Sequence, residues 1–153
     1  MNLYPDTSFF VALRFFDDIH HEKATEFFEA HSGDTLLWSP WHRVEISNAL
    51  RQFAHGESAV LRTAEARRII HRLETDVRLG YFLHMEADWR DVLRTAYEIS
   101  VEHAFSLPCR SADLLHVAYA KELAADSFVT FDEDQTELAA EAGLDVIRVE
   151  EAN

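Results

Sequence analysis

Several residue types are scarce in this chain of 153 residues. Its one cysteine, Cys109, excludes an internal disulfide and any metal site built from several thiolates. Four glycines and three prolines leave no flexible linker or low-complexity tract. No apolar run approaches the roughly 20 residues of a membrane span, and the first residues lack the basic and apolar regions of a secretory signal. We therefore expect one domain over residues 1–153 that works in the cytoplasm, away from membranes.

Positive charge is also scarce, because 14 Lys and Arg residues stand against 28 Asp and Glu residues, a net charge of −14. Such an average repels polyanions. The charge is uneven, however: residues 43–78 hold seven arginines and five acids, whereas residues 121–153 hold ten acids. Arginine pairs bidentately with phosphate or carboxylate. The segment 43–78 is therefore suited to RNA or to an acidic partner peptide, unless it forms a solvated helix face with local ion pairs.

Short apolar runs alternate with helical periodicity along the chain. The strands are predicted at residues 2–5, 35–38, 80–84, 127–131 and 145–149. The helices are predicted at residues 8–15, 20–31, 40–55, 58–75, 87–103, 110–124 and 134–142. This alternation predicts an α/β fold of three layers with a mainly parallel sheet. Ligands of such sheets bind at the carboxyl ends of the strands.

Four acids fall near the ends of these elements. Asp6 and Asp132 follow predicted strands, while Glu45 and Asp113 lie near the starts of predicted helices. Each position is compatible with one pocket at the sheet edge. Helix capping explains the three aspartates equally well, and an exposed helix position explains Glu45. If the four acids converge, their repulsion calls for a hard divalent cation such as Mg²⁺, which prefers oxygen ligands.

Four segments carry a resemblance to a known family. They are DTSFFVAL, WHRVEISNAL, RSADLLHVAYA and FVTFDEDQTELAAEAGLDVIRV. In this order they resemble the PIN domain family and, more narrowly, the VapC-like toxins of toxin–antitoxin pairs. The resemblance covers essentially the whole chain. It implies a three-layer PIN-like fold, a ribonuclease that uses Mg²⁺ or Mn²⁺, an RNA substrate, an antitoxin protein as a separate chain, and a homodimer.

The resemblance also implies roles for individual residues. The family's acids fall on Asp6, Glu45, Asp113 and Asp132. The three aspartates are expected to hold the metal, directly or through water, and Glu45 to position or deprotonate the attacking water. The family's hydroxyl beside the first aspartate matches Thr7 or Ser8, in a supporting role. Gln135 matches a polar position often found after the last acid.

Some positions stay open. Pro5 replaces the usual aliphatic residue before Asp6, and because proline cannot donate to a sheet ladder, we expect a slight displacement of Asp6. Asp134 is an alternative to Asp132.

Three further residues are weaker candidates for the substrate site. Arg43 and Arg51 share the helix of Glu45 and are candidates for phosphate contacts. His116 lies one turn after Asp113, so it either contacts a nucleotide or makes a structural hydrogen bond.

Two other functions are compatible with the sequence. One is a non-catalytic PIN-like module that docks a protein or RNA, which Pro5 and the acidic composition favour. The other is a metal-dependent phosphotransfer domain of the receiver or haloacid dehalogenase kind. That chemistry wants an acidic pair beside the first aspartate, where this chain has Thr7 and Ser8. A zinc site is not indicated, since the nine histidines form no HExxH motif.

Overall fold

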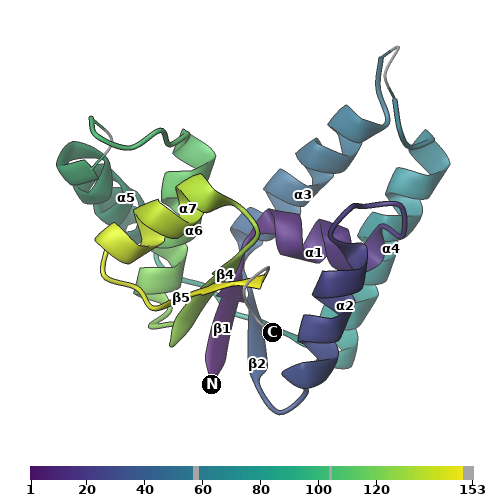
Figure 1. Ribbon diagram of the computed structural model, residues 1–153, viewed down its shortest axis with the longest axis horizontal. Helices are drawn as coiled ribbons and strands as arrows, with labels where there is room; N and C mark the ends of the chain where they lie inside the picture. Colours follow the sequence, from purple (N-terminus) through teal and green to yellow (C-terminus); the bar gives the residue numbers. More distant parts are fainter. Residues whose placement is uncertain (57–58, 104, 150–153) are drawn as a thin grey trace.

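A computed structural model describes residues 1–56, 59–103 and 105–149 (Figure 1). Its strands are β1 (Asn2–Pro5), β2 (Thr35–Trp38), β3 (Phe82–His84), β4 (Ser127–Thr130) and β5 (Val146–Arg148). They form one sheet in the order β3-β2-β1-β4-β5, and all pairings are parallel. The mainly parallel sheet that the sequence predicts is thus fully parallel in the described ranges. β1 lies at its centre.

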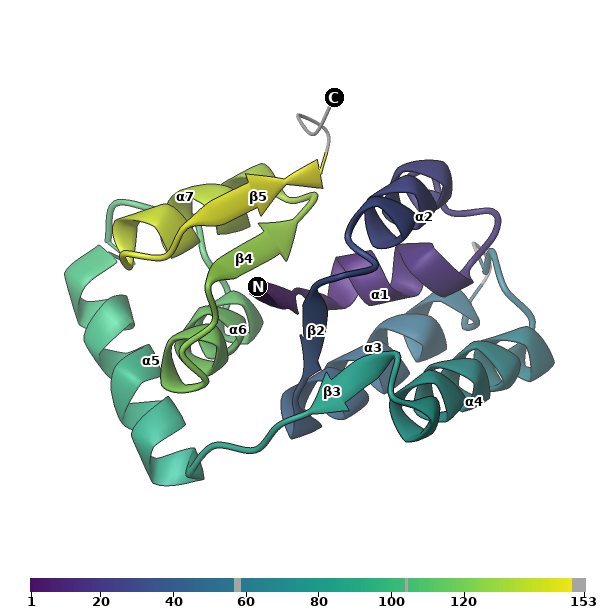
Figure 2. The ribbon, with the colours of Figure 1, turned by 90° about the horizontal axis from the view of Figure 1, so that it is seen from below.

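Helices cover both faces of this sheet (Figure 2). One face carries α1 (Thr7–Arg14), α2 (His21–Ala30), α3 (Pro40–Phe53) and α4 (Thr63–Leu79), and the other carries α5 (Trp89–His103), α6 (Ser111–Glu122) and α7 (Glu133–Glu141). The predicted three-layer α/β/α fold is confirmed. None of the helices in the described ranges has the length and apolar character that crossing a bilayer requires.

The sheet separates two hydrophobic cores. Successive strand residues point to opposite faces, so Leu3 and Val129 pack with α1 to α4, whereas Tyr4 and Phe128 pack with α5 to α7. All four side chains are fully buried. This burial on both sides explains why the strands read as apolar runs without a polar face.

Pro5 is accommodated at the end of β1. β1 pairs with β2 at Asn2 and Leu3. Pro5, which has no backbone N–H, therefore lies beyond the end of that ladder. The Pro5 carbonyl accepts a hydrogen bond from His42 Nε2 at 2.8 Å. On the other side the Asp6 N–H donates to the Val129 carbonyl at 2.9 Å, which continues the ladder to β4. The backbone of Asp6 therefore stays hydrogen-bonded to β4 in spite of Pro5.

Helix α4 lies later in the chain than predicted. Position 58, the predicted start, is outside the described residues, and residues 59–62 are not helical. The helix begins after Arg62, whose backbone N–H donates to the Glu65 carboxylate at 2.8 Å. The Glu65 side chain thereby satisfies the backbone N–H at the start of the helix, which is one half of a capping box.

The end of α4 is set by Gly80, which adopts the left-handed conformation with φ +82°. The helix therefore runs four residues beyond the predicted 75, and the third strand begins at Phe82 rather than at residue 80.

Gly80→Ala should lower the free energy of unfolding by about 1 kcal/mol, because a β-carbon disfavours the left-handed region. Nothing lies within 4 Å of the added carbon, so the effect isolates backbone strain. Gly33→Ala is the matched control, since Gly33 has open space and no positive φ. Urea denaturation of both variants measures the difference, and equal stabilities would contradict this account of the helix end.

Candidate active site

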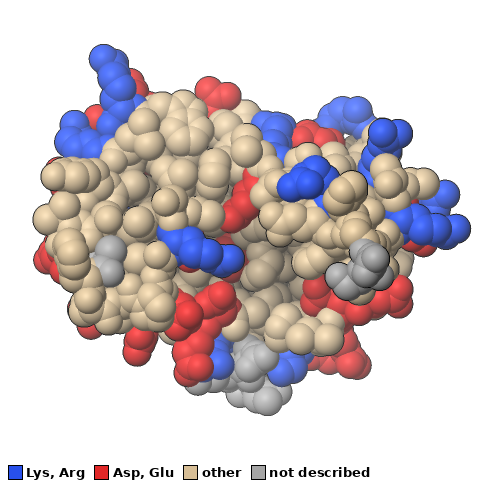
Figure 3. All heavy atoms as spheres, turned by 90° about the horizontal axis from the view of Figure 1, so that it is seen from above, with Lys and Arg blue, Asp and Glu red and all other residues tan. Residues whose placement is uncertain are grey.

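A cleft of about 340 Å³ opens at the carboxyl edge of the sheet. Its walls include the four predicted acids, Asp6, Glu45, Asp113 and Asp132. They come from four elements that are distant in sequence, namely the ends of β1 and β4 and the starts of α3 and α6. The structure therefore brings all four predicted acids to one place. In Figure 3, acidic and basic atoms meet in a hollow near the centre of the view.

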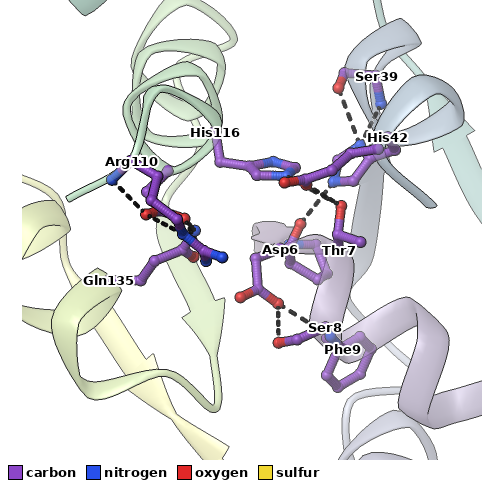
Figure 4. A network of polar contacts seen from close by, with 12 residues as sticks. Asp6, Thr7, Ser8, Phe9, Ser39, His42, Arg110, His116 and Gln135 are labelled. Carbon is purple, nitrogen blue, oxygen red and sulfur yellow. Dashed lines mark hydrogen bonds and ion pairs between the residues drawn. The ribbon is translucent and has the colours of Figure 1, made fainter. Parts of the chain in front are cut away.

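Asp6 is both a helix cap and a wall of the cleft. The residue is only 3% exposed. Oδ1 accepts hydrogen bonds from the Ser8 hydroxyl at 2.6 Å and the Phe9 N–H at 3.0 Å, which caps α1 (Figure 4). Oδ2 accepts from the Thr130 hydroxyl at 2.7 Å. Burial raises the pKa of Asp6 in spite of these hydrogen bonds.

Thr130 ties two of the acids together, which the sequence analysis missed. Besides donating to Asp6, its Oγ1 accepts the N–H of Asp132 at 2.9 Å. The hydroxyl is fully buried. The only sequence signal was a threonine two residues before an acid at a strand end.

Thr130→Val keeps the side-chain shape and removes this hydroxyl. We expect it to lower the free energy of unfolding by about 1–3 kcal/mol at neutral pH, because Asp6 loses a buried donor. The loss should shrink in acid, where a protonated Asp6 no longer needs that donor.

Thr136→Val is the matched control, because the Thr136 hydroxyl only meets the exposed backbone carbonyl of Asp132. It should cost less than about 0.5 kcal/mol. Equal losses in the two variants, measured by chemical denaturation, would show that Thr130 does not hold Asp6.

Glu45 is held by two side chains from other elements. Its Oε2 accepts hydrogen bonds from the Thr7 hydroxyl and from His116 Nε2. Burial favours a raised pKa for Glu45. The hydrogen bond from His116, the charge interaction with His116 and the hydrogen bond from Thr7 together outweigh burial and lower the pKa of Glu45. The side chain is 21% exposed, so the alternative of a plain exposed helix position is wrong.

His116 belongs to a buried polar chain beneath the cleft. The side chain is 1% exposed, and its Nδ1 lies 3.2 Å from the Tyr4 hydroxyl. From there hydrogen bonds continue through Ser39 Oγ, at 3.1 Å, and His42 Nδ1, at 3.0 Å. His116 therefore makes the structural hydrogen bonds that one interpretation predicted, and it also lines the cleft. Tyr4 and His42 are additions that the sequence analysis missed.

His42 is neutral, with its proton on Nε2. Its Nδ1 accepts the Ser39 N–H at 2.9 Å, and its Nε2 meets the Pro5 carbonyl, which can only accept. Burial lowers the pKa of His42 well below the ordinary value. The chain of hydrogen bonds from Glu45 therefore ends on the backbone just before Asp6.

Asp113 lies under an arginine that the sequence analysis did not select. Arg110 clamps its carboxylate through Nε and Nη2, both at 3.2 Å, and through its backbone N–H at 2.8 Å. Gln135 Nε2 adds a hydrogen bond at 3.0 Å. Burial favours a raised pKa for Asp113, but the bonds from Arg110 and Gln135 lower it. Arg110 itself is 78% exposed.

Asp132, rather than Asp134, reaches the cleft. Asp132 caps α7 through the Gln135 N–H at 3.1 Å and lines the cleft. Asp134 is exposed on the first turn of α7 and does not line it.

Neither predicted phosphate-binding arginine lines the cleft. Arg43 pairs with Glu74 at 2.7 Å and lies 3.0 Å from His84 Nε2. Arg51 is exposed and donates to Asn48 at 3.0 Å. The arginine in the cleft wall is Arg110, so the structure favours Arg110 over both for a phosphate contact.

The donor set fits a hard divalent cation in kind, since carboxylate oxygens suit Mg²⁺ and Mn²⁺. Across the described residues, no three Asp, Glu, His or Cys side chains converge closely enough to hold one ion between them. Asp6, Asp113 and Asp132 would therefore bind it after turning from their present partners, or through water. Buried Gln135 Oε1 has no hydrogen-bond partner in the described part of the chain and is a further oxygen on the cleft wall.

This fold and cleft define an α/β domain with a carboxylate-rich site at the carboxyl edge of a parallel sheet. The sequence matches the PIN domain family over residues 3–141. The chain belongs to the PIN domain family.

Solved structures share the fold. FitAcB from Neisseria gonorrhoeae has a TM-score of 0.67 at 18% identity, covering 97% of this chain and 99% of that chain. VapC20 from Mycobacterium tuberculosis, described as a sarcin–ricin loop cleaving toxin, has a TM-score of 0.67 at 20% identity, covering 95% and 97%. VapBC-1 from nontypeable Haemophilus influenzae has a TM-score of 0.66 at 13% identity, covering 99% and 100%. No curated protein sequence is a significant match.

Proposed function

We propose that the chain is a metal-dependent endoribonuclease that hydrolyses RNA phosphodiester bonds and acts as the toxin of a toxin–antitoxin pair. The observation that carries this proposal is the single cleft lined by Asp6, Glu45, Asp113 and Asp132. Membership of the PIN domain family supports it, and favours a nuclease over the phosphotransfer alternative. VapC20, which is similar in fold, is described as a sarcin–ricin loop cleaving toxin.

Asp6, Asp113 and Asp132 would hold Mg²⁺ or Mn²⁺. When bound, such an ion supplies an activated water and stabilises the charge that develops on the phosphate. The chain itself keeps the acids in place. Thr130 donates to the Asp6 carboxylate and accepts from the Asp132 backbone N–H, so it links the two strand ends that carry these acids. A local cation also offsets the repulsion between the acidic chain and RNA.

Glu45 is proposed to position or deprotonate the attacking water. In the described structure both of its hydrogen bonds fall on Oε2, which leaves Oε1 to accept a proton from water. The lowered pKa of Glu45 keeps the carboxylate ionised at neutral pH. His116 and Thr7 are thus positioning residues, which act through Glu45.

Arg110 is the proposed phosphate contact. Its guanidinium neutralises Asp113 in the present conformation. When a metal takes over that neutralisation, the exposed side chain is free to turn to a phosphate of the substrate.

The proposed partners are an antitoxin chain and a second copy of this chain. The arginines of α4 are exposed and suit acidic side chains of an antitoxin. VapC20, which is similar in fold, is described as a toxin. The cytoplasm remains the proposed location.

The second candidate is a binding module without catalysis. One observation favours this module. Within the described residues, no three of the acids lie close enough together to hold one ion between them.

One assay separates the two candidates. The purified chain is incubated with a pool of structured RNAs in Mn²⁺, in Mg²⁺ and in EDTA, with a DNA pool beside it. We expect RNA cleavage only with metal, and mapping of the cut ends then identifies the target. Metal binding without cleavage of any RNA would favour the module.

A further inference from the structure

The side chain of Tyr4 is a polar anchor inside the core between the sheet and α5 to α7. It lies on the central strand β1 and is fully buried. Its ring stacks on Phe128 of β4 with 5.9 Å between the ring centroids, and the centroid of the His42 ring lies 4.8 Å away. Both neighbours are fully buried as well. Because such a close-packed ring has little room to move, the sheet sets the position of the Tyr4 hydroxyl.

The Tyr4 hydroxyl is the point at which three elements meet. It lies 3.1 Å from Ser39 Oγ, at the start of α3, and 3.2 Å from His116 Nδ1 on α6. Helix α3 carries Glu45, and helix α6 carries Asp113. The hydroxyl therefore joins the central strand to the two helices that supply two of the acids of the cleft.

The Tyr4 hydroxyl can serve His116 as a donor or as an acceptor. Burial raises the pKa of Tyr4 well above its ordinary value, so the hydroxyl keeps its proton. His42 Nδ1 already accepts the Ser39 N–H, so the Ser39 hydroxyl can donate either to that nitrogen, at 3.0 Å, or to Tyr4. In the first case Tyr4 donates to Ser39 and accepts from His116, and in the second it donates to His116 Nδ1. Rotation of two hydroxyl groups changes one case into the other, so His116 Nδ1 keeps its partner in both.

The partner at Nδ1 governs what the other side of the His116 ring presents to the cleft. Nε2 contacts Glu45 Oε2 and lies 3.1 Å from Thr7 Oγ1 (Figure 4). If the ring turned over about its bond to Cβ, a carbon would replace each nitrogen, and the contacts with Tyr4 and Glu45 would both be lost. A partner on each nitrogen thus fixes the ring orientation. Tyr4 favours the orientation that aims Nε2 at Glu45.

We propose that Tyr4 is a positioning residue for RNA cleavage, which acts through His116 to hold Glu45 in its working position. The inference rests on the proposed nuclease function. Tyr4 is fully buried and does not line the cleft, so it acts without touching RNA. Tyr119 shows that this core buries a tyrosine without such a contact. It is also fully buried, and its hydroxyl has no hydrogen-bond partner in the described part of the chain.

Tyr4→Phe removes one oxygen and keeps the packed ring. We expect kcat for metal-dependent cleavage to fall about tenfold, with KM for RNA within about twofold, because Glu45 is less well held while the lining of the cleft is unchanged. Tyr119→Phe is the matched control, since it removes the unpartnered hydroxyl from the same core. It should leave both constants unchanged, and circular dichroism shows that both variants are folded.

A double variant tests whether Tyr4 acts through His116. His116→Asn already breaks the contact with Glu45, so adding Tyr4→Phe should lower kcat by less than about twofold more. Losses that multiply in the double variant would overturn the proposal, and so would a Tyr4→Phe rate equal to that of Tyr119→Phe. Metal-dependent cleavage by the wild-type chain would still support the proposed nuclease function in either case.

A second measurement needs no activity. In protein labelled with ¹³C at the glutamate carboxyl groups, without metal, Glu45→Gln assigns the Glu45 resonance. Tyr4→Phe should shift that resonance, because Tyr4 reaches Glu45 through His116, and Tyr119→Phe should leave it in place. A wild-type chain that cuts no RNA would refute the proposed function, and this resonance would then decide on the coupling alone. An unshifted resonance in Tyr4→Phe would mean that Tyr4 does not hold Glu45.

Discussion

Asp6→Asn should lower metal-dependent RNA cleavage by more than about 100-fold. Asp6 follows β1, the central strand, and Asp132 follows the neighbouring strand β4. Its replacement by a neutral amide removes a hard anionic ligand but keeps an oxygen that can cap α1. Loss of a ligand should exceed the roughly 10–100-fold effects typical of residues that only support ligands. Initial cleavage rates in Mn²⁺, with the RNA identified from the pool, measure the effect.

The matched control is Asp134→Asn, two residues beyond Asp132. Asp134 is an exposed acid on the same edge that does not line the cleft, so its removal changes the net charge equally and should leave the rate within about twofold. If Asp6→Asn cut RNA as fast as Asp134→Asn, Asp6 would have no role in the reaction.

Loss of activity in Asp6→Asn should not come from unfolding. Burial raises the folded-state pKa of Asp6 above the ordinary value of 3.8. The associated stability is therefore fully present below the unfolded pKa and is lost as the pH rises through the folded pKa. The asparagine amide does not ionise, so the variant does not lose this stability. In EDTA at neutral pH it should therefore melt at or above the wild-type temperature. A lower melting temperature would mean that the Asp6 carboxylate is stabilising.

His116→Asn should lower the cleavage rate about 10–100-fold while leaving metal affinity unchanged. The asparagine amide reaches as far as the Nδ1 atom of histidine, so it retains the contact with Tyr4 and loses the contact of Nε2 with Glu45. Glu45 then loses the hydrogen bond that most lowers its pKa. The pKa of Glu45 should rise, and the acid limb of the pH–rate profile should move to higher pH.

His116→Gln is the matched variant, because the longer amide reaches the position of Nε2 and can still donate to Glu45. It should recover most of the rate and the original acid limb. A histidine with only a packing role would give similar losses in both variants, with no movement of the pH profile.

Much of the fold is predictable because its strands are short, apolar and regularly separated by helices. The positions of Asp6 and Asp132 followed from the strand ends alone, since parallel strands present their carboxyl ends at one edge. For Asp6 the two competing interpretations are both correct, because the cap of α1 and the wall of the cleft are the same carboxylate. Spacing gave no reason to choose between them.

The supporting residues could not be predicted because their partners are remote in sequence. Thr130 meets Asp6 across 124 positions, and Tyr4 meets His116 across 112. In the sequence, Tyr4 reads as a core aromatic, and only the register of β1 places its hydroxyl beneath the cleft. Arg110 escaped notice because its role arises from the geometry of the first turn of α6, where its backbone and side chain share Asp113.

The limits of α4 were wrong for a local reason. Its cap uses Arg62 and Glu65 instead of a serine or threonine, so the usual start signal was missing. Its last four residues, 76–79, were assigned to no element, although Gly80 marks the end of the helix.

Calorimetric titration of Mn²⁺ into the purified chain tests the central claim most directly, that Asp6, Asp113 and Asp132 share one metal site. We expect saturable binding that is lost in Asp6→Asn and retained in Asp134→Asn. Absence of binding at millimolar Mn²⁺, or binding to Asp6→Asn as tight as to the wild type, would contradict the claim.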